Sequence, residues 1–404
     1  LNLKYEDIKK EIKVHTKLIF QEIVSIRRWL HKHPELSFKE KKTSEYICRV
    51  LEKHNISFTT GVGGYGVVAL IKCQDSKSKV IGVRADMDAL PIQEKNNIEY
   101  KSINDGVMHA CGHDVHTSIA LGTAIVLNHL KHKLIGTVKI IFQPAEEQLP
   151  GGASLMIEQG VLEKPRVDKM LALHVFPEFE VGDIGFRSGQ YMAACDELSV
   201  TVKGKGGHAA LPQKVINPIN AAANLLINIK REVSNIAKGK KYVLEFGDFH
   251  AYGASNVIPE NAFLQGTLRT LDESFRKEVY ELLLFESKKI EKNYNVSCAF
   301  NIKKGYPSLY NNPDLTEYCV AQSKNFLDKN FIKELDVRMA SEDFAYFSQN
   351  CPSCFFRLGV ANSEKKITNL VHTPYFNVDE KCLEIGVGLM SYLTAVNLLS
   401  LKAA

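Results

Sequence analysis

The pattern of the fold is clearest in the stretch Val80-Ile-Gly-Val-Arg-Ala-Asp-Met-Asp88. Its apolar beginning is typical of a buried strand, and two carboxylates follow it. Outward from this stretch, residues 115–130 have the apolar spacing of a helix, and residues 137–142 form another short apolar run. Strands that alternate with helices in this way predict an α/β fold, a mostly parallel sheet flanked by helices. Ligands of such sheets gather at the carboxyl ends of the strands, where we expect Asp86 and Asp88.

The alternation of strands and helices changes near residue 186. Beyond it, half-exposed strand patterns and two helical stretches predict an α+β sandwich, with both helices on one antiparallel sheet. Strand patterns again alternate with helical patterns after about residue 306. We therefore expect one α/β domain in two parts, residues 1–186 and 306–404, interrupted by an inserted domain over residues 187–305.

Two helix starts are predicted from residues that cap helices. The stretch Ser37-Phe-Lys-Glu40 has the spacing of a capping box, so a helix is expected to open there. Asp379 is the expected N-cap of a final helix over residues 380–399.

Composition and charge exclude several classes of protein. The 404 residues carry a formal charge of +5 and no basic stripe, so we expect no nucleic-acid partner. No stretch approaches about 18 uncharged apolar residues, so no membrane span is expected. Residues 1–17 lack the features of a secretory signal, and the nine scattered cysteines favour a reducing, cytoplasmic location. Cys351 and Cys354 have C-x-x-C spacing, but they lead into a strand, so a redox or metal role is not favoured.

Metal-binding side chains are densest in the stretch Met108-His-Ala-Cys-Gly-His-Asp-Val-His116. Thiolate and imidazole are the ligands that zinc prefers, and imidazole also suits manganese, cobalt and nickel. In an extended loop, Cys111 and His113 would point the same way because they are two residues apart. The alternative is a loop with a buried cysteine and surface histidines. The density of these side chains favours a metal site.

Two adjacent carboxylates, Glu146 and Glu147, follow the predicted strand over residues 137–142. Adjacent buried carboxylates repel each other, and a metal ion would relieve the repulsion for the one that binds it. The other would then be free to act as a general base toward water. The alternative is an exposed acidic turn, but the position at a strand end favours function.

Further candidates are single residues near strand ends. His174 ends an apolar run and His372 lies in the stretch Leu-Val-His-Thr-Pro-Tyr. A lone histidine is more often structural than a ligand, although these positions improve the case for a ligand. Asp86 and Asp88 are candidates either for ligands or for acceptors that orient a ligating imidazole.

The inserted domain also carries candidate residues. The glycine-rich stretch Gly204–Pro212 holds His208 but lacks the spacing and ending of a phosphate loop. Asn256 and Arg269 follow, and an arginine on a strand can hold a substrate carboxylate through two hydrogen bonds. The alternatives are a mobile loop and a solvated surface arginine.

Taken together, these segments resemble the metal-dependent amidohydrolase family of hippurate hydrolase, N-acyl-amino-acid deacylases, N-acetyl-diaminopimelate deacetylase and the plant auxin-conjugate hydrolases. They occur in the family's order and cover nearly the whole chain. The matching segments are Arg28–Ser37, Arg84–Pro91, Met108–Asp114, Phe142–Glu147, Gly207–Pro212, Ser255–Pro259, Ser341–Phe344 and His372–Pro374. One departure is the stretch Gln148-Leu-Pro-Gly-Gly152, where the family is more glycine-rich.

The resemblance implies a two-metal exopeptidase-like catalytic domain and an inserted lid domain that forms a homodimer or homotetramer. The metals implied are two divalent ions per subunit, zinc or manganese, with cobalt or nickel as further candidates. The ligand positions are those of Cys111, His113, Glu147, His174 and His372. By the same resemblance Glu146 is the catalytic base, and His208 reaches the active site of a partner subunit. Asn256 and Arg269 would recognise the substrate.

The expected function is metal-dependent hydrolysis of the amide bond of N-acyl L-amino acids, with acetyl, benzoyl or similar acyl groups. A hydroxide generated at the metal ions would attack the carbonyl, with Glu146 as general base. A metallo-carboxypeptidase or dipeptidase would use the same chemistry on another acyl group. A non-catalytic amino-acid-binding relative is the third alternative, although a binding protein needs no general base.

Overall fold

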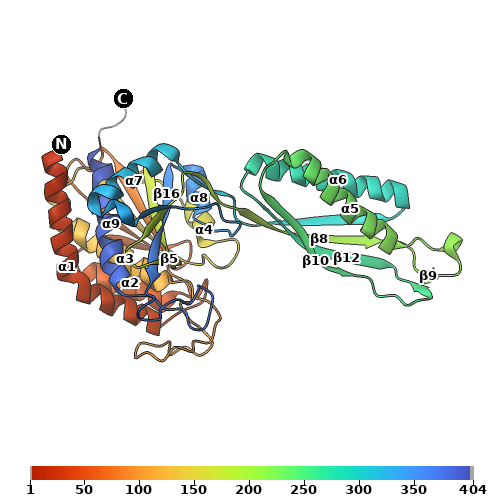
Figure 1. The fold of residues 1–404 in the computed structure, drawn as a ribbon, viewed down its shortest axis with the longest axis horizontal. Coiled ribbons are helices and arrows are strands. Elements are labelled where there is room, and N and C mark those ends of the chain that lie inside the picture. The colour runs from red at the N-terminus through yellow and green to blue at the C-terminus, as the bar shows by residue number, and fades with distance from the viewer. Residues whose placement is uncertain (1, 401–404) are drawn as a thin grey trace. The chain divides into compact units, whose positions relative to one another are not determined.

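The computed structural model describes residues 2–400, and its side chains from residue 5 onward. Backbone contacts divide these residues into two compact units (Figure 1). The first unit extends to Gly189 and includes Tyr310–Asp336 and the chain from Asp343 onward. The second unit consists of Gln190–Leu309 together with Val337–Glu342, a short segment that the sequence analysis grouped with the α/β domain.

The first unit is built on an eight-stranded mixed sheet. The order of its strands is β1 (Ser57–Val62), β2 (Gly66–Lys72), β4 (Thr137–Gln143), β3 (Val80–Asp86), β5 (Lys169–Glu180), β16 (Ser353–Ala361), β6 (Ile184–Phe186) and β15 (Ile332–Glu334). The central strands β4, β3, β5 and β16 run parallel to one another, and β1 and β2 are added antiparallel at one edge. The predicted α/β sheet flanked by helices is therefore confirmed.

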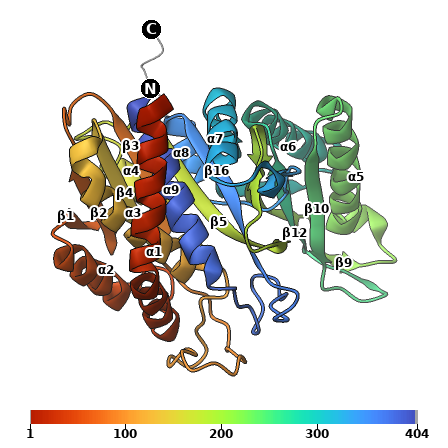
Figure 2. The ribbon, with the colours of Figure 1, turned by 60° about the vertical axis from the view of Figure 1, so that its left-hand side comes forward.

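Helices pack against this sheet because their apolar faces are buried there. One continuous core joins the central strands to α1 (Asn2–Lys32), α2 (Lys41–Lys53), α3 (His113–Leu130), α7 (Pro313–Phe326) and α9 (Lys381–Leu399). Helices α1, α3 and α9 lie side by side (Figures 1 and 2). Two further helices, α4 (Gly152–Glu158) and α8 (Ala345–Asn350), pack on each other and against β4 and β16.

Helix α9 is long and apolar enough, by length and composition alone, to cross a membrane. It is the one such helix in residues 2–400, and 83% of its most apolar window is buried inside the protein. The criterion of about 18 uncharged apolar residues did not select this helix. Its apolar run is interrupted by Glu384, Ser391 and Asn397. A helix buried to this extent has its apolar surface covered by the first unit's core.

The second unit has its own antiparallel sheet and its own core. The order of the strands is β10 (Tyr242–His250), β12 (Asn261–Thr270), β8 (Ala194–Lys203) and β13 (Ser297–Lys304). Helices α5 (Pro218–Ala237) and α6 (Glu273–Tyr294) pack on each other and share one apolar core with the sheet, as predicted. The remaining short strands are β7 (Gly189–Met192), β9 (Gly207–His208), β11 (Val257–Ile258) and β14 (Leu309–Asn311).

The capping box predicted over residues 37–40 is wrong. Helix α2 begins at Lys41, and Glu40, at the N-cap position, makes no capping hydrogen bond with its side chain. The Ser37 hydroxyl donates instead to Asp88 Oδ2 at 2.6 Å. A buried carboxylate from another segment competes for this hydroxyl better than a nearby helix amide does, because a bond to an ionised acceptor is stronger.

The last helix also begins slightly later than predicted. Helix α9 starts at Lys381, with Glu380 at the N-cap position. Asp379 nevertheless receives a hydrogen bond from the Lys381 backbone N–H at Oδ1, at 2.9 Å.

Candidate metal centre

The candidate ligands gather near the ends of β3 and β4, although His174, expected near a strand end, lies in the middle of β5. Asp86 is the last residue of β3, Glu146 and Glu147 follow β4, and His174 lies within β5. Parallel neighbouring strands end at the same edge of a sheet, so segments far apart in sequence meet there. Gly112 has a φ of +82°, a left-handed conformation that favours glycine, and it turns the chain directly into α3 at His113.

Cys111 is the shared member of two groups of side chains that could hold metal ions. Its sulfur lies 3.4 Å from His174 Nε2 and 3.3 Å from His372 Nε2. The first group is Cys111, His113 and His174, and the second is Cys111, Glu147 and His372. Within each group the candidate ligand atoms lie within 4.8 Å of one another. All five ligands predicted from the sequence therefore meet in one place.

Neighbouring groups orient the imidazoles of two candidate ligands. His113 Nδ1 lies 3.2 Å from Asp88 Oδ1, and His174 Nδ1 donates to the Val175 carbonyl at 2.7 Å. Each of these contacts leaves Nε2 directed away from its partner, and outer contacts of this kind fix ligating imidazoles. Asp88 therefore acts on His113 from outside the two groups.

His116 and His109 do not join the two groups. His116 Nε2 accepts from the Val175 backbone N–H at 2.9 Å, so Nδ1 carries the proton donated to Asp86 Oδ1 at 2.6 Å. Both of its nitrogens are thus used within the protein. His109 is buried, and neither of its ring nitrogens has a hydrogen-bond partner among residues 5–400. Burial lowers the pKa of His109 to about 4.

The donor set fits divalent metal ions. Nε2 of His113 is buried and makes no hydrogen bond within the described part of the chain. Oε1 of Glu147 is buried too, and it lies 3.2 Å from His372 Nε2. Burial raises the pKa of the Cys111 thiol well above its ordinary value, and the carboxylates of Glu147 and Glu146 raise it further. A thiolate there needs a cation beside it. Thiolate, imidazole and carboxylate together are a zinc-type donor set, and imidazole and carboxylate also suit manganese.

The charges around His113 also favour a bound cation. Burial lowers the pKa of His113, but Asp86 and Asp88 outweigh it and raise the pKa to about 10. Burial likewise raises the pKa of Asp86, yet His113, Arg84 and His116 hold it well below its ordinary value. The carboxylates thus favour a positive charge at His113, whether a proton or a metal ion.

Glu146 is buried, with 7% of its surface exposed, and lies near His113 and Glu147. The Asp343 backbone N–H donates to Glu146 Oε1 at 3.4 Å. The Asp343 carboxylate in turn receives hydrogen bonds from Arg84 at 2.7 Å and from Gln143 at 2.7 Å. No motif in the sequence predicts these contacts of Asp343, because they join three segments that are far apart in the chain.

The predicted residues of the inserted domain lie in the second unit. His208 is exposed, on β9, and its Nδ1 accepts from the Ala210 backbone N–H at 3.1 Å. Asn256 is beside it, because the Asn256 carbonyl accepts from the Ala209 N–H at 3.0 Å. Arg269 lies on β12 and donates to the Met339 carbonyl at 3.0 Å.

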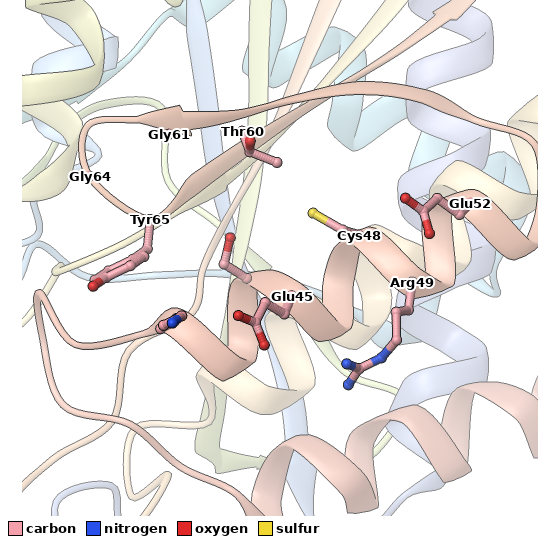
Figure 3. Close-up of a pocket in the computed structure, with 10 residues that line it drawn as sticks. Glu45, Cys48, Arg49, Glu52, Thr60, Gly61, Gly64 and Tyr65 are labelled. Carbon is pink, nitrogen blue, oxygen red and sulfur yellow. The ribbon is translucent and has the colours of Figure 1, made fainter.

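Two other features take no part in this centre. The pair Cys351 and Cys354 forms no disulfide, and Cys354 is fully buried in β16. An open groove between α2 and the β1–β2 turn is lined by Glu45, Arg49 and Tyr65, among others (Figure 3). None of the predicted site residues lines this groove.

The chain is similar to known proteins along most of its length. The sequence profile of "Peptidase family M20/M25/M40" matches residues 82–395. The "Putative amidohydrolase YhaA" of Bacillus subtilis is 36% identical over 377 residues, 93% of this chain and 94% of the relative. The "N-acetylcysteine deacetylase" of the same organism is 36% identical, covering 96% and 98%. The "Thermostable carboxypeptidase 2" of Saccharolobus solfataricus is 35% identical, covering 94% and 96%.

Two solved structures are similar along almost the whole chain. A putative aminohydrolase from methicillin-resistant Staphylococcus aureus has a TM-score of 0.90 and 34% identity, covering 96% of this chain and 100% of that one. The Bacillus subtilis YXEP protein, described as a dinuclear metal binding peptidase from the M20 family, has a TM-score of 0.80 and 33% identity, covering 95% and 100%.

Proposed function

The chain belongs to peptidase family M20/M25/M40 and is a hydrolase, and from this premise we propose that it cleaves the amide bond of N-acyl L-amino acids. The observation that carries the proposal is the pair of metal-ligand groups that share Cys111, with the buried Glu146 beside them. Relatives named amidohydrolase and N-acetylcysteine deacetylase support the same class of substrate.

The metal ions would be held by Cys111, His113, Glu147, His174 and His372. Divalent ions bound there would polarise the amide carbonyl and lower the pKa of a water molecule. Zinc or manganese is the proposed metal, with cobalt or nickel as substitutes, because a shared thiolate and three imidazoles are among the ligands.

Glu146 is the proposed general base. The Asp343 N–H donates to Glu146 Oε1, and the buried carboxylate would take a proton from the attacking water. The same carboxyl would then return that proton to the nitrogen of the leaving amino acid. Burial strengthens both transfers, because water is kept from the carboxylate.

Residues of the second unit complete the proposal. His208 would donate a hydrogen bond to the oxygen on which negative charge develops. Arg269 and Asn256 would hold the carboxylate of the amino acid, as a guanidinium and an amide can.

His208 would serve the site of a partner subunit in a homodimer or homotetramer formed through the second unit. Exposed apolar side chains on α5 and α6, such as Ile227 and Phe285, support such an assembly, which light scattering would test.

A carboxypeptidase activity is the second candidate. It is favoured by the relatives in Saccharolobus solfataricus named thermostable carboxypeptidase, at 35% and 34% identity. The residues that move the proton would be the same, and only the group on the acyl side of the bond would differ.

The test is the release of free amino acid from N-acetyl and N-benzoyl amino acids and from dipeptides. The protein is stripped of metal and reloaded separately with zinc, manganese, cobalt or nickel. We expect metal-dependent release that is at least about tenfold faster from acyl amino acids than from dipeptides. Faster release from dipeptides would favour the carboxypeptidase, and no release from any substrate with two metal ions bound would overturn both candidates.

A further inference from the structure

Glu40 is a buried carboxylate that the catalytic proposal does not use. Its side chain is fully buried just before α2. Oε1 accepts from the Phe38 backbone N–H at 2.9 Å and from the Ala145 N–H at 2.8 Å. Oε2 is buried and has no hydrogen-bond partner among the residues that the structure describes. One oxygen of Glu40 therefore joins two chain segments about a hundred residues apart.

Both residues that Glu40 holds have a left-handed backbone. The φ of Phe38 is 64° and that of Ala145 is 52°, and neither residue is glycine. Such a conformation is unfavourable for a side chain with a Cβ and persists only where surrounding contacts hold it. Ala145 is fully buried, and its carbonyl also accepts from the Gly152 N–H at 2.9 Å.

Ala145 directly precedes the two glutamates of the candidate metal centre. Its left-handed turn lets the chain leave β4 and bring Glu146 and Glu147 to the ligand cluster. The Glu147 N–H is fixed separately, because it donates to Asp88 Oδ2 at 3.0 Å. The turn is thus held at two amides, by Glu40 before the glutamates and by Asp88 within them.

We propose that Glu40 is a positioning residue for the hydrolase, which fixes the Ala145 amide so that Glu146 can act as base and Glu147 can bind metal. It acts through the backbone and contacts neither substrate nor metal. The effect expected on kcat rests on the proposed function. The effect expected on metal affinity rests on the candidate metal centre alone.

The experiment compares two substitutions with one matched control. Glu40→Met keeps the length of the side chain and removes the acceptor, so both amides lose their partner. Glu40→Gln keeps a carbonyl oxygen that can accept both hydrogen bonds. The control is Glu35→Met, because Glu35 also accepts two hydrogen bonds at the start of α2, from the Thr43 N–H at 2.8 Å and the Thr43 hydroxyl at 3.0 Å. Glu35 makes no hydrogen bond to the turn among those between described residues.

We expect Glu40→Met to lower kcat about tenfold to a hundredfold with a smaller change in KM, the usual size for outer contacts of a metal site. Metal affinity, from calorimetric titration of zinc into metal-free protein, should fall about tenfold or more. Glu40→Gln should recover both quantities to within about threefold of wild type. Glu35→Met should lower the melting temperature but leave kcat and metal affinity unchanged.

Equal losses of kcat and metal affinity in Glu40→Met and Glu35→Met would overturn the proposal, because helix stability alone would then explain them. So would an unchanged Glu40→Met. If Glu40→Met does not fold, Glu40→Asp replaces it, because the shorter carboxylate cannot reach both amides. In that case, a Glu40→Gln variant as impaired as Glu40→Asp would contradict the positioning role. If the wild type hydrolyses no acyl amino acid, the zinc titration still tests Glu40, so the two proposals fail separately.

Discussion

At the residue scale, two neighbouring glutamates have different surroundings and therefore different expected roles. The carboxylate of Glu147 lies 3.2 Å from His372 Nε2, among the candidate ligands. Glu146 accepts a hydrogen bond at Oε1 from the Asp343 N–H. We expect Glu146→Gln to bind two metal ions as wild type does and to lose about a hundredfold or more of kcat, because an amide cannot accept the proton. Steady-state kinetics together with elemental analysis would check this, and wild-type turnover would remove the role.

Cys111 contributes to both ligand groups, so its loss should affect both metal ions. We expect Cys111→Ala to retain less than one metal ion per chain after extensive dialysis, measured by elemental analysis. Cys48→Ala is the matched control, since Cys48 lies on α2 outside both groups. Full metal content in Cys111→Ala would show that the thiolate is not a ligand.

Glu40 should also give a measurable dependence of stability on pH in the metal-free protein. Burial raises the pKa of Glu40 to about 7, and the neighbouring Asp88 adds to the rise. Because the folded pKa exceeds the unfolded value, 4.5, the folded state binds the proton more tightly between these values. The contribution of Glu40 to stability is therefore present below about pH 4.5 and is lost as pH rises through about 7.

The neutral variant Glu40→Gln has no such titration. Its stability relative to wild type, from urea unfolding, should therefore rise between about pH 4.5 and pH 7. A difference that stays constant over this range would contradict the raised pKa.

At the element scale, β4 has separate functions along its length. Its end leads to the two glutamates, while Lys139, in its middle, is buried and donates to three backbone carbonyls. These are the carbonyls of Val161 at 2.8 Å, Glu163 at 2.7 Å and Pro165 at 2.8 Å. One ammonium group thus satisfies three acceptors of the segment that follows α4 and precedes β5.

Lys139→Met should destabilise the protein by about 3 kcal/mol. Each buried carbonyl left without a partner costs about 1–3 kcal/mol, and some of the three carbonyls would regain hydrogen bonds from water. Lys72→Met is the control, because Lys72 is exposed at the end of β2; we expect a change within about 0.5 kcal/mol. Chemical unfolding measures both. Equal stabilities for the two variants would show that the three carbonyls find other partners.

At the scale of the whole molecule, the two units have separate cores, and the five candidate metal ligands all lie in the first unit. Metal binding stabilises the state that binds it, by about 4 kcal/mol at a thousandfold excess over Kd. Removing the metals with a chelator should therefore speed amide exchange about tenfold or more around residues 109–115 and 144–149. The amides of β8 and β12 should be unaffected. Hydrogen-exchange mass spectrometry would check this, and equal acceleration in both units would contradict it.

The sequence by itself determined the main features of the fold. The alternation of apolar strands with helices predicted the α/β sheet, and the half-exposed strands predicted the antiparallel sheet with two helices. These features depend on local periodicity and burial, which a single segment records. The order of motifs also indicated the family, because each motif is a short contiguous stretch.

Only the tertiary structure decided which groups meet outside the predicted ligand set. Ser37 contacts Asp88, Glu40 contacts Ala145, and Arg84 contacts Asp343. The tertiary structure also showed that His116 is hydrogen-bonded to Asp86 and Val175, although His116 lies in the same stretch of sequence as His113. Each of these is a choice between a nearby partner and a distant one. The distant partner is preferred because the fold buries both groups together, and a buried polar group must be satisfied where it lies.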